Sequence, residues 1–158
     1  MSSHHRRVLL AVCALAIFVS PRPVRGQELT GTWTSEVPVR VAATNGSEQV
    51  EQTATVTLSL QQHGDSVHGT WQMSPLPDRP NPPARQLRGV VHDGRIVLTD
   101  TTEAMIRRNG EPPSSVTMIN TLELRLDGDR LSGTQSARSA DGMVSTQPRA
   151  FTATRVRS

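Results

Sequence analysis

Hydrophobic and polar residues alternate along most of the chain from residue 27 onward. Residues 53–60, Thr-Ala-Thr-Val-Thr-Leu-Ser-Leu, alternate without a fault, and residues 116–126 do so with the single exception of Ile119. A period of two is typical of strands with one buried and one solvated face. Because we find no convincing helical period in this part of the sequence, we expect an all-β fold.

Short polar sequences that favour tight turns separate the alternating runs. They are Asn45-Gly46, Gly64-Asp65, Asp93-Gly94 and Asp127-Gly128-Asp129. These residue types tolerate the positive φ that hairpin loops require. Strands joined in succession by such loops pair antiparallel with their neighbours, so the sequence predicts an antiparallel meander.

The turns can be checked against one another, because a hairpin loop fixes which residues lie opposite each other. Loops at residues 45–46 and 93–94 give these opposing pairs: Val41 with Val50, Val37 with Ala54, Trp33 with Leu58, Val91 with Ile96, and Gly89 with Leu98. A loop at Asp65-Ser66 would place Leu60 opposite Trp71 and Leu58 opposite Met73. The loops at residues 45–46 and 65–66 put Leu58 on the same side of the sheet, and the three loops together give one consistent buried face, which indicates a continuous sheet.

Glycine recurs inside the predicted strands, in a short motif with a hydrophobic residue two positions before it. Its positions are Gly31, Gly69, Gly89 and Gly133. Glycine weakens a strand unless it permits a bend or a close approach of neighbouring backbone, as barrel corners require. Closure also removes exposed sheet edges. We therefore predict an antiparallel up-and-down barrel of about eight strands.

Two stretches interrupt the meander. Residues from Ser74 to Ala84 contain five prolines, which exclude a central strand and favour a stiff, extended loop. Residues from Glu103 to Ser115 are predicted to form a second connection, with at most a short strand near 104–107. Both can lie at one open end of a barrel. The proline-rich loop is a candidate contact for a protein partner, and it is also explained as a connection without one.

The first 26 residues have the features of a secretory signal peptide. Arg6 and Arg7 precede an apolar run, residues 8–19, and small residues surround the expected cleavage before Gln27. The run is too short to span a bilayer. We therefore expect one exported domain, residues 27–158, without a membrane span, in the periplasm or outside the cell. The single cysteine, Cys13, would leave with the leader.

Removal of the leader changes the charge balance. All 17 basic residues are arginines, and four of them lie in residues 1–26, so 13 remain against 14 acidic residues. A mature domain with a net charge of −1 lacks the basic excess of nucleic-acid-binding proteins, and we expect no nucleic-acid partner.

Few residues of the expected mature domain suit catalysis. It has no Lys, Tyr or Cys, its serines lie in no Gly-x-Ser-x-Gly elbow, and most of its aspartates occupy predicted turns. We find no phosphate loop and no dinucleotide fingerprint, and we expect no cofactor and no enzyme. An enzyme built on the barrel would need a cluster of polar groups that spacing alone does not reveal.

Two histidines are the strongest metal candidates. A loop at residues 65–66 would place His63 directly opposite His68, both facing outward. A metal site normally needs a third and a fourth ligand, which the sequence does not supply nearby. We therefore interpret both as solvated surface residues and predict no metal site.

Three polar residues interrupt apolar rows on the predicted buried face: Ser35, Gln52 and Asn120. A buried hydroxyl or amide without a partner is costly, so each must find a hydrogen bond, a water molecule or an open mouth. One hypothesis is that these residues orient a ligand in an otherwise apolar interior. The other is that they contact trapped water or backbone near a rim.

The two ends of the domain resemble the terminal signatures of the calycins, the superfamily of lipocalins, fatty-acid-binding proteins and avidins. The residues concerned are Gly31 and Trp33 on the first strand and Arg155 on the last. The resemblance implies that Arg155 lies across the Trp33 indole at the closed end of the barrel, a cation–π contact with a structural role. The mature domain lacks the tyrosine and the several tryptophans of an avidin site, so biotin binding is not implied. The resemblance is closest to small secreted bacterial lipocalin-like domains.

These observations predict an exported, non-catalytic barrel that binds a small, largely apolar ligand in its interior. The alternative is a structural or protein-contacting envelope module, or an inhibitor, with a filled core. Inward-facing Gly, Ala, Thr and Val leave space, whereas Leu, Met and Trp fill it. The predicted inward set contains both kinds, so both functions stay open at this point.

Overall fold

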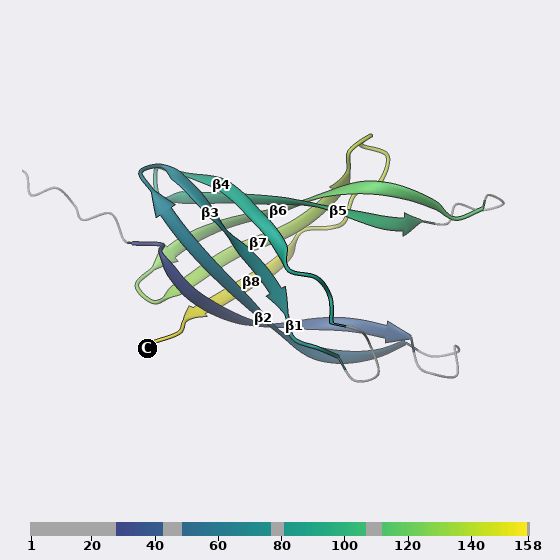
Figure 1. Ribbon diagram of the computed structural model, residues 1–158, viewed down its shortest axis with the longest axis horizontal. Helices are drawn as coiled ribbons and strands as arrows, with labels where there is room; N and C mark the ends of the chain where they lie inside the picture. Colours follow the sequence, from purple (N-terminus) through teal and green to yellow (C-terminus); the bar gives the residue numbers. More distant parts are fainter. Residues whose placement is uncertain (1–27, 43–48, 77–80, 107–111, 158) are drawn as a thin grey trace, which may run out of the picture.

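The computed structural model describes residues 28–42, 49–76, 81–106 and 112–157, and these form an all-β domain. Eight strands follow one another along the chain (Figure 1): β1 (Gly31–Ala42), β2 (Gln49–His63), β3 (Ser66–Met73), β4 (Arg85–His92), β5 (Arg95–Ile106), β6 (Ser114–Asp127), β7 (Arg130–Ser139) and β8 (Arg149–Arg155). The proposed leader lies outside the described residues.

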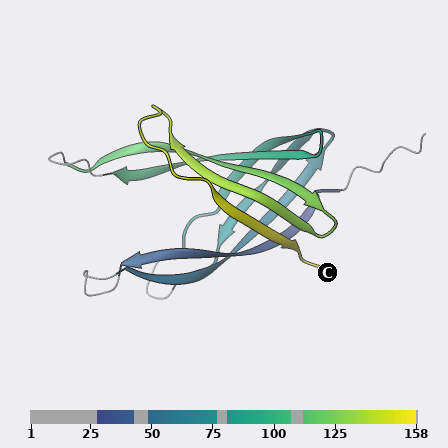
Figure 2. The ribbon, with the colours of Figure 1, turned by 180° about the vertical axis from the view of Figure 1, so that it is seen from behind.

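Each strand pairs antiparallel with the next, and β8 pairs with β1 to close the barrel. The first strand and the last therefore lie side by side, as the views from both sides show (Figures 1 and 2). The predicted antiparallel up-and-down barrel of eight strands is confirmed.

Two of the three predicted registers are confirmed. Val37 pairs with Ala54 and Trp33 with Leu58 across β1 and β2, although the turn at Asn45-Gly46 lies outside the described residues. Across β4 and β5, Val91 pairs with Ile96 and Gly89 with Leu98. Residues 93 and 94 both have positive φ, 49° and 73°, as a type I′ loop requires.

The predicted register between β2 and β3 was wrong by two residues. The loop is Gly64-Asp65 rather than Asp65-Ser66, so Trp71 lies opposite Leu58. Gly64 has a φ of +60°, which suits the first position of a type II′ loop, where glycine is favoured. A shift of two residues keeps the same side chains on the buried face, which is why the sheet was still predicted correctly.

The second predicted connection is shorter than expected. Strand β5 continues through Glu103 to Ile106, and β6 begins at Ser114, with Ala104 opposite Val116. The alternation of side chains continues through this stretch, so the prolines at residues 112 and 113 interrupt the chain only after the ladder has ended. The proline-rich stretch contains no strand in its described parts, residues 74–76 and 81–84, as predicted.

Three of the strand glycines lie against the backbone of a neighbouring strand. A Cβ atom would come within 2.3 Å of the Ser59 carbonyl oxygen at Gly69, and within 1.9 Å of the Val97 and Glu123 carbonyl oxygens at Gly89 and Gly133. A side chain cannot occupy that space, so these glycines permit the close approach on which the curvature of the barrel depends.

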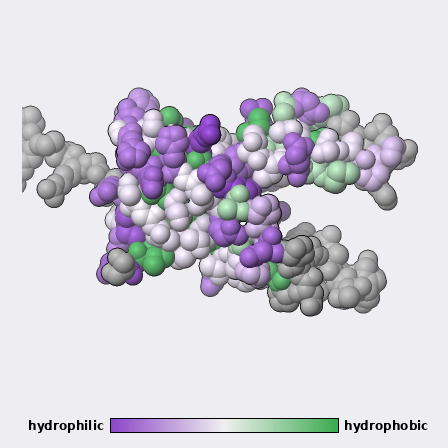
Figure 3. All heavy atoms as spheres, viewed as in Figure 1, coloured by the Kyte–Doolittle hydropathy of each residue, from purple (hydrophilic) through white to green (hydrophobic). Residues whose placement is uncertain are grey.

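Apolar side chains fill the closed half of the barrel, where the two ends of the described chain meet. Seven large apolar residues there are essentially inaccessible to solvent: Leu29, Trp33, Leu58, Leu60, Leu98, Leu124 and Leu131. Trp71 and Phe151 lie above them with ring centroids 5.6 Å apart. Exposed large hydrophobic residues are few and scattered over a mostly hydrophilic surface (Figure 3).

Two hairpins extend beyond the closed wall in the same direction (Figure 1). Strand β8 pairs with β1 only at Trp33 and Thr34, so the rest of β1 continues with β2 alone as the β1–β2 arm, residues 35–42 and 49–55. Strand β4 pairs with β5 only as far as Thr99. Beyond that point β5 pairs with β6 alone, and residues 101–106 and 114–117 form the β5–β6 arm. The open end of the barrel lies between these two arms.

Candidate functional site

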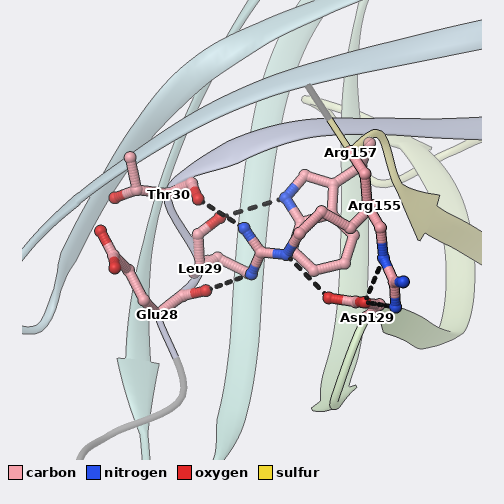
Figure 4. Close-up of polar contacts among 7 residues, drawn as sticks. Glu28, Leu29, Thr30, Asp129, Arg155 and Arg157 are labelled. Carbon is pink, nitrogen blue, oxygen red and sulfur yellow. Dashed lines mark hydrogen bonds and ion pairs between the residues drawn. The ribbon is translucent and has the colours of Figure 1, made fainter.

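The closed end of the barrel is held by Arg155. Its guanidinium carbon lies 4.2 Å from the centroid of the Trp33 ring, and its Nη1 donates to the Thr30 carbonyl oxygen at 2.7 Å (Figure 4). Nη2 donates to the Glu28 carbonyl oxygen, and Nε lies 3.3 Å from a carboxylate oxygen of Asp129. The contact between Trp33 and Arg155 that the calycin resemblance implies is therefore present.

Gly31 is part of the same arrangement. It has a φ of +144°, and a Cβ atom there would lie 2.7 Å from Arg155 Nη1. Arg157 also binds Asp129, with 2.6 Å between Nη2 and Oδ2, and its hydrogen bond is the main cause of the lowered pKa of Asp129. Because every nitrogen of the Arg155 guanidinium already has a partner, this end of the barrel is structural.

The open end contains a cavity of about 900 Å³. Its wall combines apolar side chains from β1 and β3 with two arginines; these residues are Val37, Val39, Trp71, Met73, Arg85 and Arg149. Both arms contribute to it, β1 through residues 37–39 and β5 through residues 101–103. Figure 3 shows the recess beside the β5–β6 arm.

Strand periodicity directs the two arginines inward. Arg85 lies two residues before Leu87 on β4, and Arg149 lies two residues before Phe151 on β8. Leu87 and Phe151 are buried in the core, and side chains two residues apart share one face of a strand. Both arginines therefore share a strand face with the core, where the apolar filling ends: Arg85 is partly buried, and Arg149, whose side chain is exposed, lies at the rim of the cavity.

A buried carboxylate holds Arg85 in place. Asp100, on β5, has a side chain only 2% exposed, and its Oδ2 lies 3.1 Å from Arg85 Nη1. The guanidinium carbon of Arg85 lies 4.6 Å from the centroid of the Trp71 ring. Burial lowers the pKa of Arg85, and the negative charge of Asp100 opposes that shift. The pair is thus an ion pair at the floor of the cavity, stacked on an aromatic ring.

Asn120 completes this group from β6. Its amide nitrogen donates to Asp100 Oδ1 and to Thr102 Oγ1, the latter at 3.2 Å. The side chain that sequence reasoning proposed as a direct ligand contact therefore orients the carboxylate that holds Arg85. Ser35 is buried and Gln52 is partly buried, and neither they nor Asn120 line the described cavity wall.

Sequence reasoning missed Arg85, Asp100 and Arg149. The signal was present, because each shares a strand face with a buried apolar residue two positions away: Leu87, Leu98 and Phe151. Charged residues were considered only in turns and on outer faces. The contact between Arg85 and Asp100 depends on the pairing of β4 with β5, so neither residue alone predicts it.

Glu103 lies at the rim of the cavity, on the β5–β6 arm. Its two carboxylate oxygens accept hydrogen bonds from Ser115 Oγ at 2.8 Å and Thr117 Oγ1 at 2.7 Å. These hydrogen bonds lower the pKa of Glu103, the one from Thr117 most. The carboxylate is thus already bound to neighbouring hydroxyls of the adjacent strand.

The histidine register was wrong for the same reason as the loop between β2 and β3. His63 pairs with Ser66, and His68 pairs with Gln61, so the two imidazoles are not opposite each other. Both side chains are exposed. Within the described ranges, no three His, Cys, Asp or Glu residues gather in a way that could bind a metal ion.

Comparisons with protein-family models, with curated proteins and with solved structures find no match to this chain. Across the described segments, no helix has the length and apolar character needed to cross a membrane. The function must therefore be argued from the cavity itself. Apolar walls beside fixed N–H donors are suited to binding a molecule that has both an apolar and a polar part.

Proposed function

We propose that this protein is an exported, calycin-like barrel that binds a small, largely apolar molecule at its open end. The cavity of about 900 Å³ carries the proposal, because its size suits a small organic ligand. Val37, Val39 and Met73 supply apolar surface beside the face of Trp71. The stacked Trp33 and Arg155 support the calycin relationship, and the apolar run at residues 8–19 supports export.

The filled half of the barrel limits where the ligand can lie. Leu58, Leu98 and Leu124 belong to one fully buried apolar cluster, so the deep interior has no room for a ligand. The binding site is therefore confined to the level of Arg85 and above. Contact with the Trp71 ring would change its fluorescence on binding, whereas Trp33 lies at the closed end.

A neutral apolar fluorophore tests the proposal directly. We expect N-phenyl-1-naphthylamine to bind the mature domain saturably, one molecule per chain, as measured by its fluorescence increase and by native mass spectrometry. Val39→Trp should abolish this binding because the larger side chain fills the cavity. Val90→Trp is the matched control, since Val90 lies on β4 with its side chain exposed outside the cavity. A folded wild-type domain that binds no such probe would refute the proposal.

One observation favours the alternative, a protein-contacting module. Within the described chain, β1 has no neighbour on its outer edge after Thr34, and β5 has none after Thr99. Exposed strand edges are surfaces on which another chain can add a strand. Probe binding that Val39→Trp abolishes would favour the ligand-binding function, and a folded domain without probe binding would favour the alternative.

A further inference from the structure

Arg85 uses only one of its three guanidinium nitrogens within the described structure. Nη1 lies 3.4 Å from Oδ1 and 3.1 Å from Oδ2 of Asp100, whereas Nε and Nη2 have no hydrogen-bond partner among the described residues. A guanidinium carries five N–H donors in a planar fork. Because the side chain lines the cavity and is 22% exposed, the edge formed by Nε and Nη2 is available to a ligand.

The position of Arg85 is fixed before any ligand arrives. Trp71 supports one face of its guanidinium, and Asp100, itself held by Asn120, binds Nη1. Immobilising a long side chain on binding costs affinity, and a preorganised donor avoids that cost. Arg85 is therefore placed as a receptor for an acceptor group.

Arg149 adds a second positive charge to the same wall. It lies on the inner face of β8, opposite Gln135 of β7, and it forms no ion pair with a described residue. A ligand that covers this guanidinium removes it from water, which is costly unless the ligand brings a counter-charge. An uncharged ligand would incur that cost, and a cationic ligand would add repulsion.

The carboxylates of the site are already bound. Asp100 pairs with Arg85 and accepts from Asn120, and Glu103 at the rim accepts from Ser115 and Thr117. Among the charged side chains that line the cavity, the groups without a partner are therefore guanidinium N–H donors. The lowered pKa of Arg85 agrees with this picture, because Asp100 only partly offsets the effect of burial.

We infer that the ligand is an amphipathic molecule with one negatively charged oxygen group, which Arg85 and Arg149 bind while its apolar body lies along Val37, Val39 and Met73. This inference rests on the proposed function, since it names the chemical class of the molecule that occupies the same cavity. A carboxylate matches the planar fork of a guanidinium and is the simplest such group.

Three probes of equal chain length separate charge from apolar contact. Dodecanoate and dodecyltrimethylammonium, each below its micellar concentration, and dodecan-1-ol, below its solubility limit, compete with N-phenyl-1-naphthylamine at pH 8 and low salt. We expect dodecanoate to bind about tenfold more tightly than the alcohol, as charge-assisted hydrogen bonds are stronger than neutral ones. The cation should bind most weakly. Added salt should reduce the preference for the acid.

Variants of the two arginines test whether these residues cause the preference for dodecanoate over dodecan-1-ol. Arg149→Gln should reduce the affinity for dodecanoate to that for dodecan-1-ol and leave the alcohol unaffected. Arg85→Gln should do the same, and if it does not fold, Arg149→Gln alone decides the test. Arg88→Gln is the matched control, because Arg88 lies on β4 with its side chain exposed on the outer face. It should retain the full preference.

The outcomes distinguish the two proposals. Equal affinity for acid and alcohol in the wild-type domain would overturn the inference and leave the proposed function intact. A preference that survives in Arg149→Gln and in a folded Arg85→Gln would also overturn it, because the charge would then be recognised elsewhere. Failure of all three probes and of the fluorophore to bind would instead refute the proposed function.

Discussion

The guanidinium carbon of Arg155 lies 4.2 Å from the centroid of the Trp33 ring, and this contact joins the last strand to the first. Strands β1 and β8 share only two paired positions, Trp33 with Arg155 and Thr34 with Thr154. The side chain of Arg155 adds hydrogen bonds to the backbone that precedes β1. The side chain of Arg155 therefore supplements a short backbone ladder in closing the barrel.

Replacement of Arg155 should destabilise the fold. Arg155→Met removes the cation–π contact with Trp33 and two charged hydrogen bonds to carbonyl groups, and we expect a loss of about 2–4 kcal/mol in the free energy of unfolding. Urea unfolding followed by tryptophan fluorescence measures it. Arg138→Met, at an exposed site on β7, serves as control. A loss no larger than that of the control would contradict the structural role.

Acid unfolding should depend on Asp129. Hydrogen bonds from Arg157 and Arg155 lower the pKa of this carboxyl below its unfolded value of 3.8. Its contribution to stability is therefore complete above about pH 4 and is lost as the pH falls through the lower folded pKa. Asp129→Asn should flatten the melting-temperature profile between pH 4 and 2. A profile parallel to that of the wild type would show that other groups govern acid unfolding.

The ion pair at the floor of the cavity should be sensitive to loss of one partner. Asp100→Asn leaves the guanidinium of Arg85 partly buried without its counter-charge, and we expect a loss of about 2–3 kcal/mol, less than for a fully buried pair because Arg85 retains some exposure. Removal of both charges, Arg85→Met with Asp100→Leu, should cost less than Asp100→Asn alone. Chemical unfolding of the wild type and the two variants tests this, and a double variant that loses as much as Asp100→Asn or more would argue against coupling.

Gly89 and Gly94 should differ in their tolerance of alanine. A Cβ at Gly89 would come within 1.9 Å of the Val97 carbonyl oxygen, so Gly89→Ala must push β4 away from β5, at a cost of about 3 kcal/mol or more. At Gly94 a Cβ meets nothing within 4 Å, and only the φ of +73° is unfavourable, at about 1–2 kcal/mol. Melting temperatures rank the two variants. The reverse order would contradict the close approach of the strands.

Pro38 should protect the free edge of β1. The Thr32 carbonyl oxygen accepts from the N–H of Val156, the residue after β8, and by alternation the backbone of Pro38 faces the same side, where it offers no N–H. Pro38→Thr restores that donor on an exposed edge, so we expect more self-association in light scattering. Pro75→Thr, in the exposed loop after β3, is the control. Equal scattering from both variants would contradict the proposal that Pro38 protects the edge of β1 against self-association.

The barrel could be predicted from the sequence because its signals are local and periodic. Alternation and the positive-φ residues of the turns specify strands and hairpins, and consecutive hairpins specify the order of the strands. The one register error arose at residues 64–66, where two adjacent loop positions fit the alternation equally well. Only the φ of Gly64 distinguishes them.

The candidate site could be predicted only in part. Asn120 was recognised as a polar residue on a buried face, but its partner Asp100 lies on another strand and was not considered. Arg85 follows a run of prolines and resembles a loop residue in one dimension. Its role depends on Trp71 and Asp100, which two separate ladders bring to it. The pattern of residues along a single strand does not show that side chains from three strands meet at one place.

The two arms have a consequence for the range of molecules that the barrel can admit. Each arm is joined to the wall at its base, where Ser74 N–H donates to the Thr55 carbonyl oxygen and Ala140 N–H donates to the Thr117 carbonyl oxygen. Beyond Thr55 and Thr117 the described part of each arm pairs only within its own hairpin, and no backbone hydrogen bond among the described residues joins one arm to the other. The width of the entrance therefore depends on how far the β1–β2 arm and the β5–β6 arm each bend, independently of the other. If the barrel binds a ligand as proposed, the entrance can admit molecules of different width while the ladder below stays intact, and selection then rests on charge more than on shape.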